Sequence, residues 1–140
     1  MSIPVIREMY RQIERRSYEL LKGAERFAEN QRLITNSQAQ GLANVINCEE
    51  KNINTVLVAY VQHQGNKSTS HEAAFWKELK RELDGLRKQA QEIQQELTVE
   101  PPGSKAAKEQ LALIHLLLAR DYVQHLVAHN GYRRAIMGGR

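Results

Sequence analysis

The sequence has little of what small folds use for covalent stabilisation or for interrupting helices. It contains one cysteine, Cys48, so no disulfide can form within the chain, and only 3 prolines among 140 residues. No stretch approaches the roughly 18 consecutive apolar residues that a membrane span requires, and the segment before Arg7 lacks the apolar core of a signal peptide. We therefore expect a soluble, cytoplasmic protein that does not associate with a membrane.

Motifs that would name a reaction are also absent. The chain has neither a glycine-rich phosphate-binding loop nor a GxSxG turn, and a lone Cys48 is more often a small buried hydrophobe than a nucleophile. Asp121, His125 and His129 have the spacing of ligands on one helix face, but the helix dipole equally favours histidines near a helix C-terminus. We expect no catalytic residue, no metal site and no cofactor, and therefore not an enzyme.

The residues that are abundant, Leu, Ala, Glu, Gln, Lys and Arg, are strong helix formers. A chain of 140 residues fits one domain and can bury roughly two-thirds of the surface that its unfolded form exposes. We expect an all-α, single-domain bundle of about five helices over residues 1–131. A basic, flexible C-terminal tail is expected to follow over residues 132–140.

Three helices are expected in the first half of the chain. The first spans Pro4–Glu29 and is capped by Ser2. A capping box of Ser37 with Gln40 opens a short second helix. Apolar residues at helical spacing over 53–61 predict a third helix, with Gly65 as its stop.

The clearest pattern is a heptad repeat in a fourth helix over His71–Leu97, which a capping box of Thr69 with Glu72 opens. Its apolar seam consists of Trp76, Leu79, Leu83, Leu86, Ala90, Ile93 and Leu97. About three heptads are a marginal length for an independent coiled coil, so we expect the seam to be core rather than a zipper between chains.

A fifth helix is expected over Lys105–His129, with Ser104 as its cap and Gly131 as its stop. Its apolar side chains point nearly all round its axis. A helix of this kind is usually surrounded by other helices. We therefore expect the last long helix to be central in the bundle.

Charge is segregated on the fourth helix. Its basic flank comprises Lys77, Lys80, Arg81, Arg87 and Lys88, with Asp84 among them, and its acidic flank comprises Glu78, Glu82, Glu92 and Glu96. A helix that buries one stripe and presents two bands of opposite charge fits between partners, and the acidic flank is expected to face a neighbouring copy. The net charge of +4 lies entirely after Ser104 and indicates an anionic partner.

Further cations complete the candidate nucleic-acid-binding set. The helix-one arc, among interleaved glutamates, comprises Arg7, Arg11, Arg15, Lys22 and Arg26, while Tyr10 is assigned to the apolar face of the same helix. Outside helices, Lys67 lies in an expected loop, and Arg133 and Arg134 lie in the expected tail. Lysine and arginine on a helix face bind phosphates without regard to sequence. The alternative is that these are solvated faces that keep the protein soluble.

A small, basic, all-helical chain without motifs resembles the small subunit of a class 1 CRISPR-Cas effector complex, of the Cascade-like or type III kind. The resemblance covers the helices Pro4–Glu29 and His71–Leu97, the connector ITNSQAQGL over residues 34–42, and the apolar last helix with its basic end. It implies copies stacked along an RNA-bound filament, with basic faces that hold a target or displaced strand.

We therefore expect a non-catalytic small subunit of a multi-subunit, RNA-guided nucleic-acid-binding complex. Its partners would be the nucleic-acid backbone, larger protein subunits and copies of itself. The alternative is a helical protein–protein interaction or adaptor module with no nucleic-acid role. Salt dependence of binding separates the two.

Overall fold

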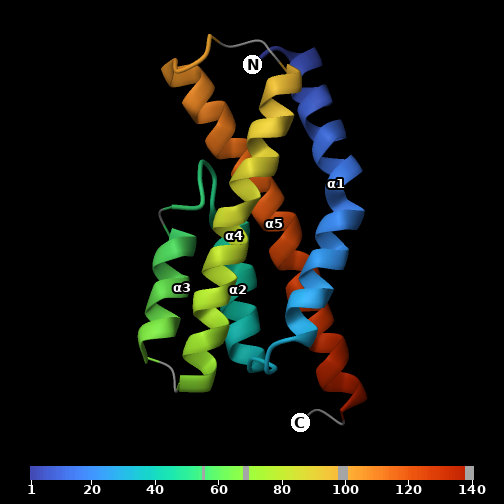
Figure 1. Ribbon diagram of the computed structural model, residues 1–140, viewed down its shortest axis with the longest axis vertical. Helices are drawn as coiled ribbons and strands as arrows, with labels where there is room; N and C mark the ends of the chain where they lie inside the picture. Colours follow the sequence, from blue (N-terminus) through green and yellow to red (C-terminus); the bar gives the residue numbers. More distant parts are fainter. Residues whose placement is uncertain (55, 68–69, 98–100, 138–140) are drawn as a thin grey trace.

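The computed structural model describes residues 1–54, 56–67, 70–97 and 101–137, and over these residues the protein is an all-α bundle (Figure 1). The described helices are α1 (Ile3–Glu29), α2 (Asn36–Cys48), α3 (Val56–Lys67), α4 (Ser70–Leu97) and α5 (Lys105–Ile136). The predicted fold class is confirmed. Ser2 caps α1 and Ser104 caps α5, each through its side-chain oxygen, as the sequence predicts.

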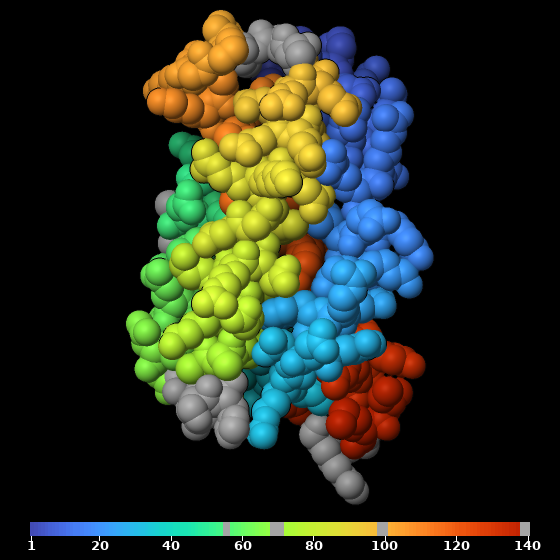
Figure 2. All heavy atoms as spheres, viewed as in Figure 1, coloured from blue at the N-terminus to red at the C-terminus, as the bar shows by residue number. Residues whose placement is uncertain are grey.

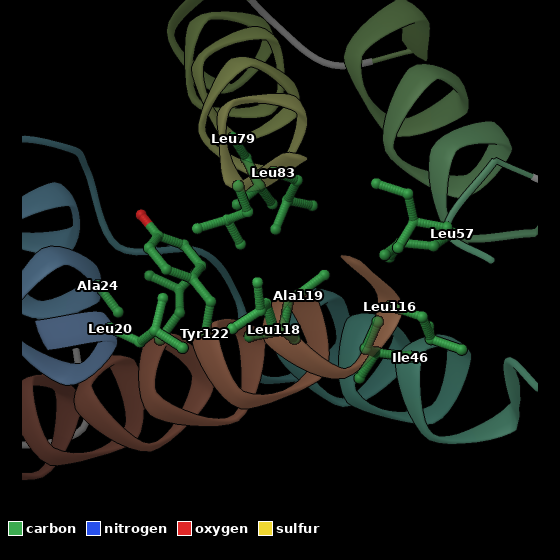
Figure 3. Close-up of a cluster of buried hydrophobic side chains, with 14 of the residues drawn as sticks. Leu20, Ala24, Ile46, Leu57, Leu79, Leu83, Leu116, Leu118, Ala119 and Tyr122 are labelled. Carbon is green, nitrogen blue, oxygen red and sulfur yellow. The ribbon is translucent and has the colours of Figure 1, made fainter. Parts of the chain in front are cut away.

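The last helix is central, as predicted. α5 packs against α1, α2 and α4, whereas α3 lies outside and packs against α2 and α4. Figure 3 shows Leu116 of α5 beside Ile46 of α2, and Leu118 and Ala119 of α5 turned toward the leucines of α4. All four of these side chains have no exposed surface. Burial of α5 from three sides explains its lack of a polar face.

The heptad seam of α4 is core rather than an intermolecular zipper within this fold, since none of its residues is more than 6% exposed. Trp76 anchors its N-terminal half. The Trp76 ring meets Phe75 edge-on at 5.0 Å between centroids and Tyr60 of α3 at 5.9 Å, and Phe75 meets Phe27 of α1 at 5.5 Å. This aromatic cluster joins α1, α3 and α4, and each such pair contributes about 0.5–1.5 kcal/mol beyond burial.

The capping box expected for α2 is at the wrong residues. Thr35 Oγ1 accepts a hydrogen bond from Gln38 N at 3.1 Å, and Gln38 Oε1 accepts one from Thr35 N at 2.9 Å. The box is therefore Thr35 with Gln38, not Ser37 with Gln40. The expected box of Thr69 with Glu72 includes a residue outside the described part of the chain.

Two glycines expected to end helices do not do so. α3 continues through Gly65 to Lys67, where a Cβ on Gly65 would come within 3.5 Å of Trp76 Cβ. That distance is an ordinary van der Waals contact, so Gly65 lies on the face of α3 that packs on α4 without being required by the packing. α5 continues through Gly131 to Ile136, because its last turns are tied to the rest of the bundle by side chains described below. The expected helix end at His129 is therefore wrong.

By length and composition, α5 is the one described helix that meets the criteria for a membrane span. The core helix of a soluble bundle meets the same criteria, because both must be apolar on all sides. In this fold α1, α2 and α4 cover α5. These contacts bury 44% of the most apolar 18-residue window of α5.

His115 is a buried polar residue on α5, with 8% of its surface exposed. Its Nε2 lies 2.7 Å from the backbone oxygen of Leu83 in α4. A carbonyl oxygen only accepts, so Nε2 carries the proton and donates it. Burial lowers the pKa of His115 from its ordinary value of 6.5, and the hydrogen bond to Leu83 opposes this in part. The ring is therefore neutral in the folded protein at neutral pH.

The lowered pKa of His115 predicts a pH-dependent stability. Below about pH 6.5 the unfolded chain binds a proton at this position that the folded chain does not, so stability falls as pH drops from about 7.5 toward the folded-state pKa. We expect His115→Gln to flatten this part of the profile, because glutamine is uncharged at all these values. Urea midpoints measured for both proteins across this range test it; parallel profiles would contradict it.

Candidate nucleic-acid interface

The basic flank lies on the solvent-facing side of α4 that is turned toward α3. Lys77, Arg81, Arg87 and Lys88 are exposed and Lys80 is half-buried. Lys77 and Lys80 line a hollow of about 190 Å³ together with residues 61, 62, 65 and 66 of α3. In Figure 2, α4 runs down the visible face between α1 and α3, and its outer side is open along its length. The predicted clustering of these cations on one accessible edge is therefore present.

Two members of the basic flank are paired within α4. Lys80 Nζ lies 3.0 Å from Asp84 Oδ2, and Arg81 Nη1 lies 2.7 Å from Glu78 Oε1. Exposed pairs of this kind contribute only about 0.2–1 kcal/mol, so an anion of higher charge density competes with them readily. The remaining members, Lys77, Arg87 and Lys88, form no ion pair with any described residue. From position 77 to position 88 the flank extends about 16 Å along the helix axis.

Glu78, Glu82 and Glu92 of the acidic flank lie beside α1 and keep exposed surface. That this flank faces a neighbouring copy stays a prediction. Arg16 Nη1 of α1 donates a hydrogen bond to Glu92 Oε1 at 3.2 Å. Burial raises the pKa of the Glu82 carboxyl, the charge of Glu78 raises it further, and Arg26 of α1 lowers it. α1 packs beside this edge of α4 and supplies Arg16 and Arg26 to it.

The helix-one arc forms a second basic surface, separated from the basic flank by the acidic flank. All five of its cations are exposed. Arg11 Nη1 pairs with Glu8 Oε2 at 3.1 Å. Arg26, by contrast, lines a hollow with Glu78 and Glu82. We therefore regard the arc as a mixed surface with a smaller net attraction for anions than the basic flank.

Two exposed tyrosines lie on α1, Tyr18 among the cations of the helix-one arc and Tyr10 beside the arc. Tyr10 is 52% exposed, so its assignment to the apolar face is wrong, and Tyr18 is 62% exposed. Lys22 Nζ lies 5.3 Å from the centroid of the Tyr18 ring, a cation–π contact. Exposed aromatic rings among cations are a feature of surfaces on which bases stack. Sequence reasoning missed Tyr18, although its angular position between Arg7 and Arg11 on the helix identifies it.

Arg133 and Arg134 are half-buried and hold α5 to the rest of the bundle. Arg133 Nη1 donates to the carbonyl oxygen of Ala28 at 2.6 Å, and Arg134 Nε donates to that of Ile34 at 2.7 Å. Asn130 adds hydrogen bonds to both the N–H and the carbonyl of Ile34. These cations stabilise carbonyl oxygens at and beyond the C-terminus of α1. We therefore omit them from the proposed interface.

Lys67, the remaining candidate, is exposed on the last turn of α3, not in a loop.

Asp121, His125 and His129 do not converge on one point. His125 Nε2 lies 3.4 Å from Asp121 Oδ2, whereas His129 Nε2 lies 3.6 Å from Glu29 Oε1 of α1. No group of three or more His, Cys, Asp or Glu side chains suited to a metal occurs in the part of the chain that the structure describes. Cys48 is exposed, so its expected role as a buried hydrophobe is wrong.

Comparison of the chain with protein-family models, with curated proteins and with solved structures gives no match. The chemistry of the surface described above is therefore the basis on which function is inferred. Its main feature is an exposed row of cations on α4 with an acidic edge turned away from it, toward α1.

Proposed function

We propose that the protein is a non-catalytic small subunit of a multi-subunit, RNA-guided nucleic-acid-binding complex. In this role the basic flank of α4 holds the phosphate backbone of a target or displaced strand. The observation that carries the proposal is the gathering of five cations on one accessible edge of α4, with Asp84 among them, while Glu78, Glu82 and Glu92 lie on the edge beside α1. Cations on an exposed helix face bind phosphates without regard to sequence.

The unpaired cations support a backbone-binding role. Lys77 and Lys88 stand about three helical turns apart and are both exposed. Neither forms a direct ion pair with a described residue, so neither has such a pair to lose when a phosphate binds. Lys67, next to the Asn66 that lines a hollow with Lys77, lengthens the row toward the end of α3. A strand bound here would run along α4.

Exposed apolar side chains at opposite ends of the bundle support contacts with other subunits. Ile3 near the N-terminus is 67% exposed, and Ile136 near the C-terminus is 65% exposed. Figure 1 shows the two termini at opposite ends of the long axis. Contacts through these ends would leave the basic flank along the side of the bundle free for a strand. Copies of this chain and larger protein subunits are the proposed partners.

Charge reversal on the basic flank tests the proposal. For Lys77→Glu with Lys88→Glu, we expect the affinity for a single-stranded oligonucleotide at low salt to fall by at least about tenfold. We also expect the slope of log K against log salt to become shallower by roughly 0.7 for each phosphate that the variant no longer neutralises. Fluorescence anisotropy at several salt concentrations measures both quantities.

The matched control is Arg32→Glu with Lys105→Glu, which changes the net charge equally at two positions outside the candidate set. We expect it to lower affinity far less than the flank variant. Equal losses in the two variants would show attraction by net charge alone. Equal losses, or an absence of binding by the unmodified protein at low salt, would contradict the proposal.

A second candidate function is an adaptor module that binds proteins and no nucleic acid. The observation that favours it is the exposure of Tyr132 and Ile136 in the last turns of α5 and of Met137 at its C-cap. Exposed apolar side chains that lie close together on one helix end mark protein-binding sites. In that case partner binding would depend weakly on salt, and the flank variant would bind its partner normally.

A further inference from the structure

A cavity of about 260 Å³ opens between α4, α5 and the loop over residues 49–54. Its polar lining consists of Arg87 of α4, Lys108 and His115 of α5, and Asn52 and Asn54 of the loop. The volume is several times the roughly 30 Å³ that one water molecule occupies, so the cavity admits a polyatomic group.

The described side chains that line the cavity include two cations and no carboxylate, and Asp84 acts on the His115 ring from outside the lining. Arg87 and Lys108 form no ion pair with any described residue. Two cations that face one hollow repel each other unless an anion lies between them. The planar guanidinium of Arg87 suits two oxygens of one phosphate, and the ammonium of Lys108 adds a compact charge. The lining therefore favours an oxyanion with several acceptor atoms.

His115 supplies a buried acceptor or donor at this cavity. The residue is more than nine-tenths buried, and its Nε2–H donates a hydrogen bond to the backbone oxygen of Leu83. Nδ1 makes no hydrogen bond with the described residues and carries a proton only when the ring is charged. The charged groups that act on the ring are Asp84 and Arg87 from α4, with Lys108 sharing the cavity from α5. A bound anion stabilises the protonated ring, which then donates from Nδ1.

The loop that closes the cavity is held in place from behind. Glu49 Oε1 accepts a hydrogen bond from Leu57 N at 2.9 Å, and Arg120 Nη2 donates to the Glu49 carbonyl oxygen at 2.6 Å. Asn54 N donates to Asn52 Oδ1 at 2.8 Å. This bond leaves the side-chain amide N–H groups of both asparagines as donors. A loop fixed before binding loses little conformational entropy when a ligand arrives.

A second hollow of about 470 Å³ adjoins the cavity and shares Asn52 and Ala112 with it. Leu113 supplies an apolar wall, and Glu50 and Glu109 supply acceptors. A small organic group attached to the phosphate fits such a mixture of apolar surface and a few hydrogen-bonding groups. Neither hollow includes Lys77 or Lys88.

We propose that this cavity binds a phosphate monoester, with the phosphate between Arg87 and Lys108 and the organic part in the adjoining hollow. The ligand is either a free phosphate compound or the phosphorylated 5′ end of a nucleic acid, which share this chemistry. The site is independent of strand binding along the rest of the basic flank, because Lys108 and His115 lie outside that flank.

Calorimetric titration with adenosine 5′-monophosphate, adenosine and inorganic phosphate tests the proposal. We expect one site per chain for adenosine 5′-monophosphate, and binding of adenosine weaker by at least about tenfold, since the hydrogen bonds to charged groups that adenosine cannot make are worth at least that much. If inorganic phosphate binds as tightly as the nucleotide, the phosphate site in the cavity is supported. The adjoining hollow then does not contribute to binding. Absence of binding by both phosphate compounds, or equal binding of adenosine, would overturn the proposal.

Matched variants locate the site. Lys108→Gln is expected to weaken adenosine 5′-monophosphate binding by about tenfold, whereas Lys105→Gln, an exposed position on the same helix outside the cavity, should leave it unchanged. Arg87→Gln and its exposed neighbour Lys88→Gln form a second pair of this kind. Equal effects within each pair would overturn the assignment. The Lys77→Glu with Lys88→Glu variant should bind the nucleotide normally, which separates this proposal from strand binding.

Two oligonucleotides of one sequence, one with a 5′-phosphate and one with a 5′-hydroxyl, identify the source of the phosphate. A preference for the phosphorylated strand that Lys108→Gln abolishes assigns the site to a strand end. Equal binding of the two strands, with the nucleotide still bound, assigns it to a free compound.

In either case we expect the pKa of the His115 ring to be higher in the complex than in the free protein. An NMR titration measures this pKa, with His125 as the internal control. An unchanged His115 pKa on binding would overturn the placement of the phosphate.

Discussion

Trp76→Ala is expected to lower the free energy of unfolding by about 3–5 kcal/mol, the range for truncating a large buried aromatic side chain. Trp76 is 1% exposed and lies at the centre of the aromatic cluster between α3 and α4. Because α3 packs only against α2 and α4 among the described helices, it has few other contacts to hold it. Urea unfolding followed by circular dichroism measures the decrease.

Trp76→Phe is the matched control for this truncation. Trp76 Nε1 is buried and has no hydrogen-bond partner among the described residues. Phenylalanine removes this unpaired donor, whose burial costs about 1–3 kcal/mol, and keeps most of the ring contact. We therefore expect a decrease well below that of Trp76→Ala. Equal stability of the two variants would contradict the role of the ring as a core anchor.

Gly41→Ala is expected to destabilise the protein by about 1–3 kcal/mol, the usual cost of overpacking. A Cβ at this position would collide with Tyr60 Oη and approach Tyr60 Cζ to 3.1 Å. The Tyr60 ring has little room to move, because its hydroxyl donates to the Gln38 carbonyl oxygen at 3.3 Å and its edge meets Trp76. This close approach of α2 and α3 explains why a glycine stands inside α2 despite its low helix propensity.

Gly85→Ala provides the comparison, because a Cβ on Gly85 meets no atom within 4 Å. Here alanine should raise stability by up to about 1 kcal/mol through helix propensity alone. The two substitutions are chemically identical and should have opposite signs in the same urea experiment. A stabilising Gly41→Ala would contradict the packing of Tyr60 over Gly41.

The helices of this fold follow from periodicity, whereas their ends do not. The seam of α4 and the apolar circumference of α5 are regular over many residues, so their burial is evident from the sequence. The start of α2 is decided between two nearly equivalent capping sequences, at Thr35 and Ser37, that lie two residues apart. Gly131 fails to stop α5 because Arg133 and Arg134 gain tertiary hydrogen bonds only if the helix continues.

The parts of the candidate site that lie on a single helix can be predicted from the sequence. The basic flank of α4 follows from angular position alone, since every member lies on the same helix. Tyr10 is exposed although Met9 and Ile13 nearby are buried, because it lies at the margin of the apolar face, and the sequence of α1 does not show how far neighbouring helices cover that face. The cavity at Arg87 and Lys108 requires α4, α5 and a distant loop to meet, so no local pattern indicates it.

Backbone amide NMR of the protein during titration with a single-stranded oligonucleotide tests strand binding by α4 most directly. We expect the largest shift changes over residues 77–88 and at the end of α3, decreasing with added salt, with small changes at Glu92 and Glu96 on the acidic flank. Shift changes confined to α1, or none anywhere at low ionic strength, would contradict the account.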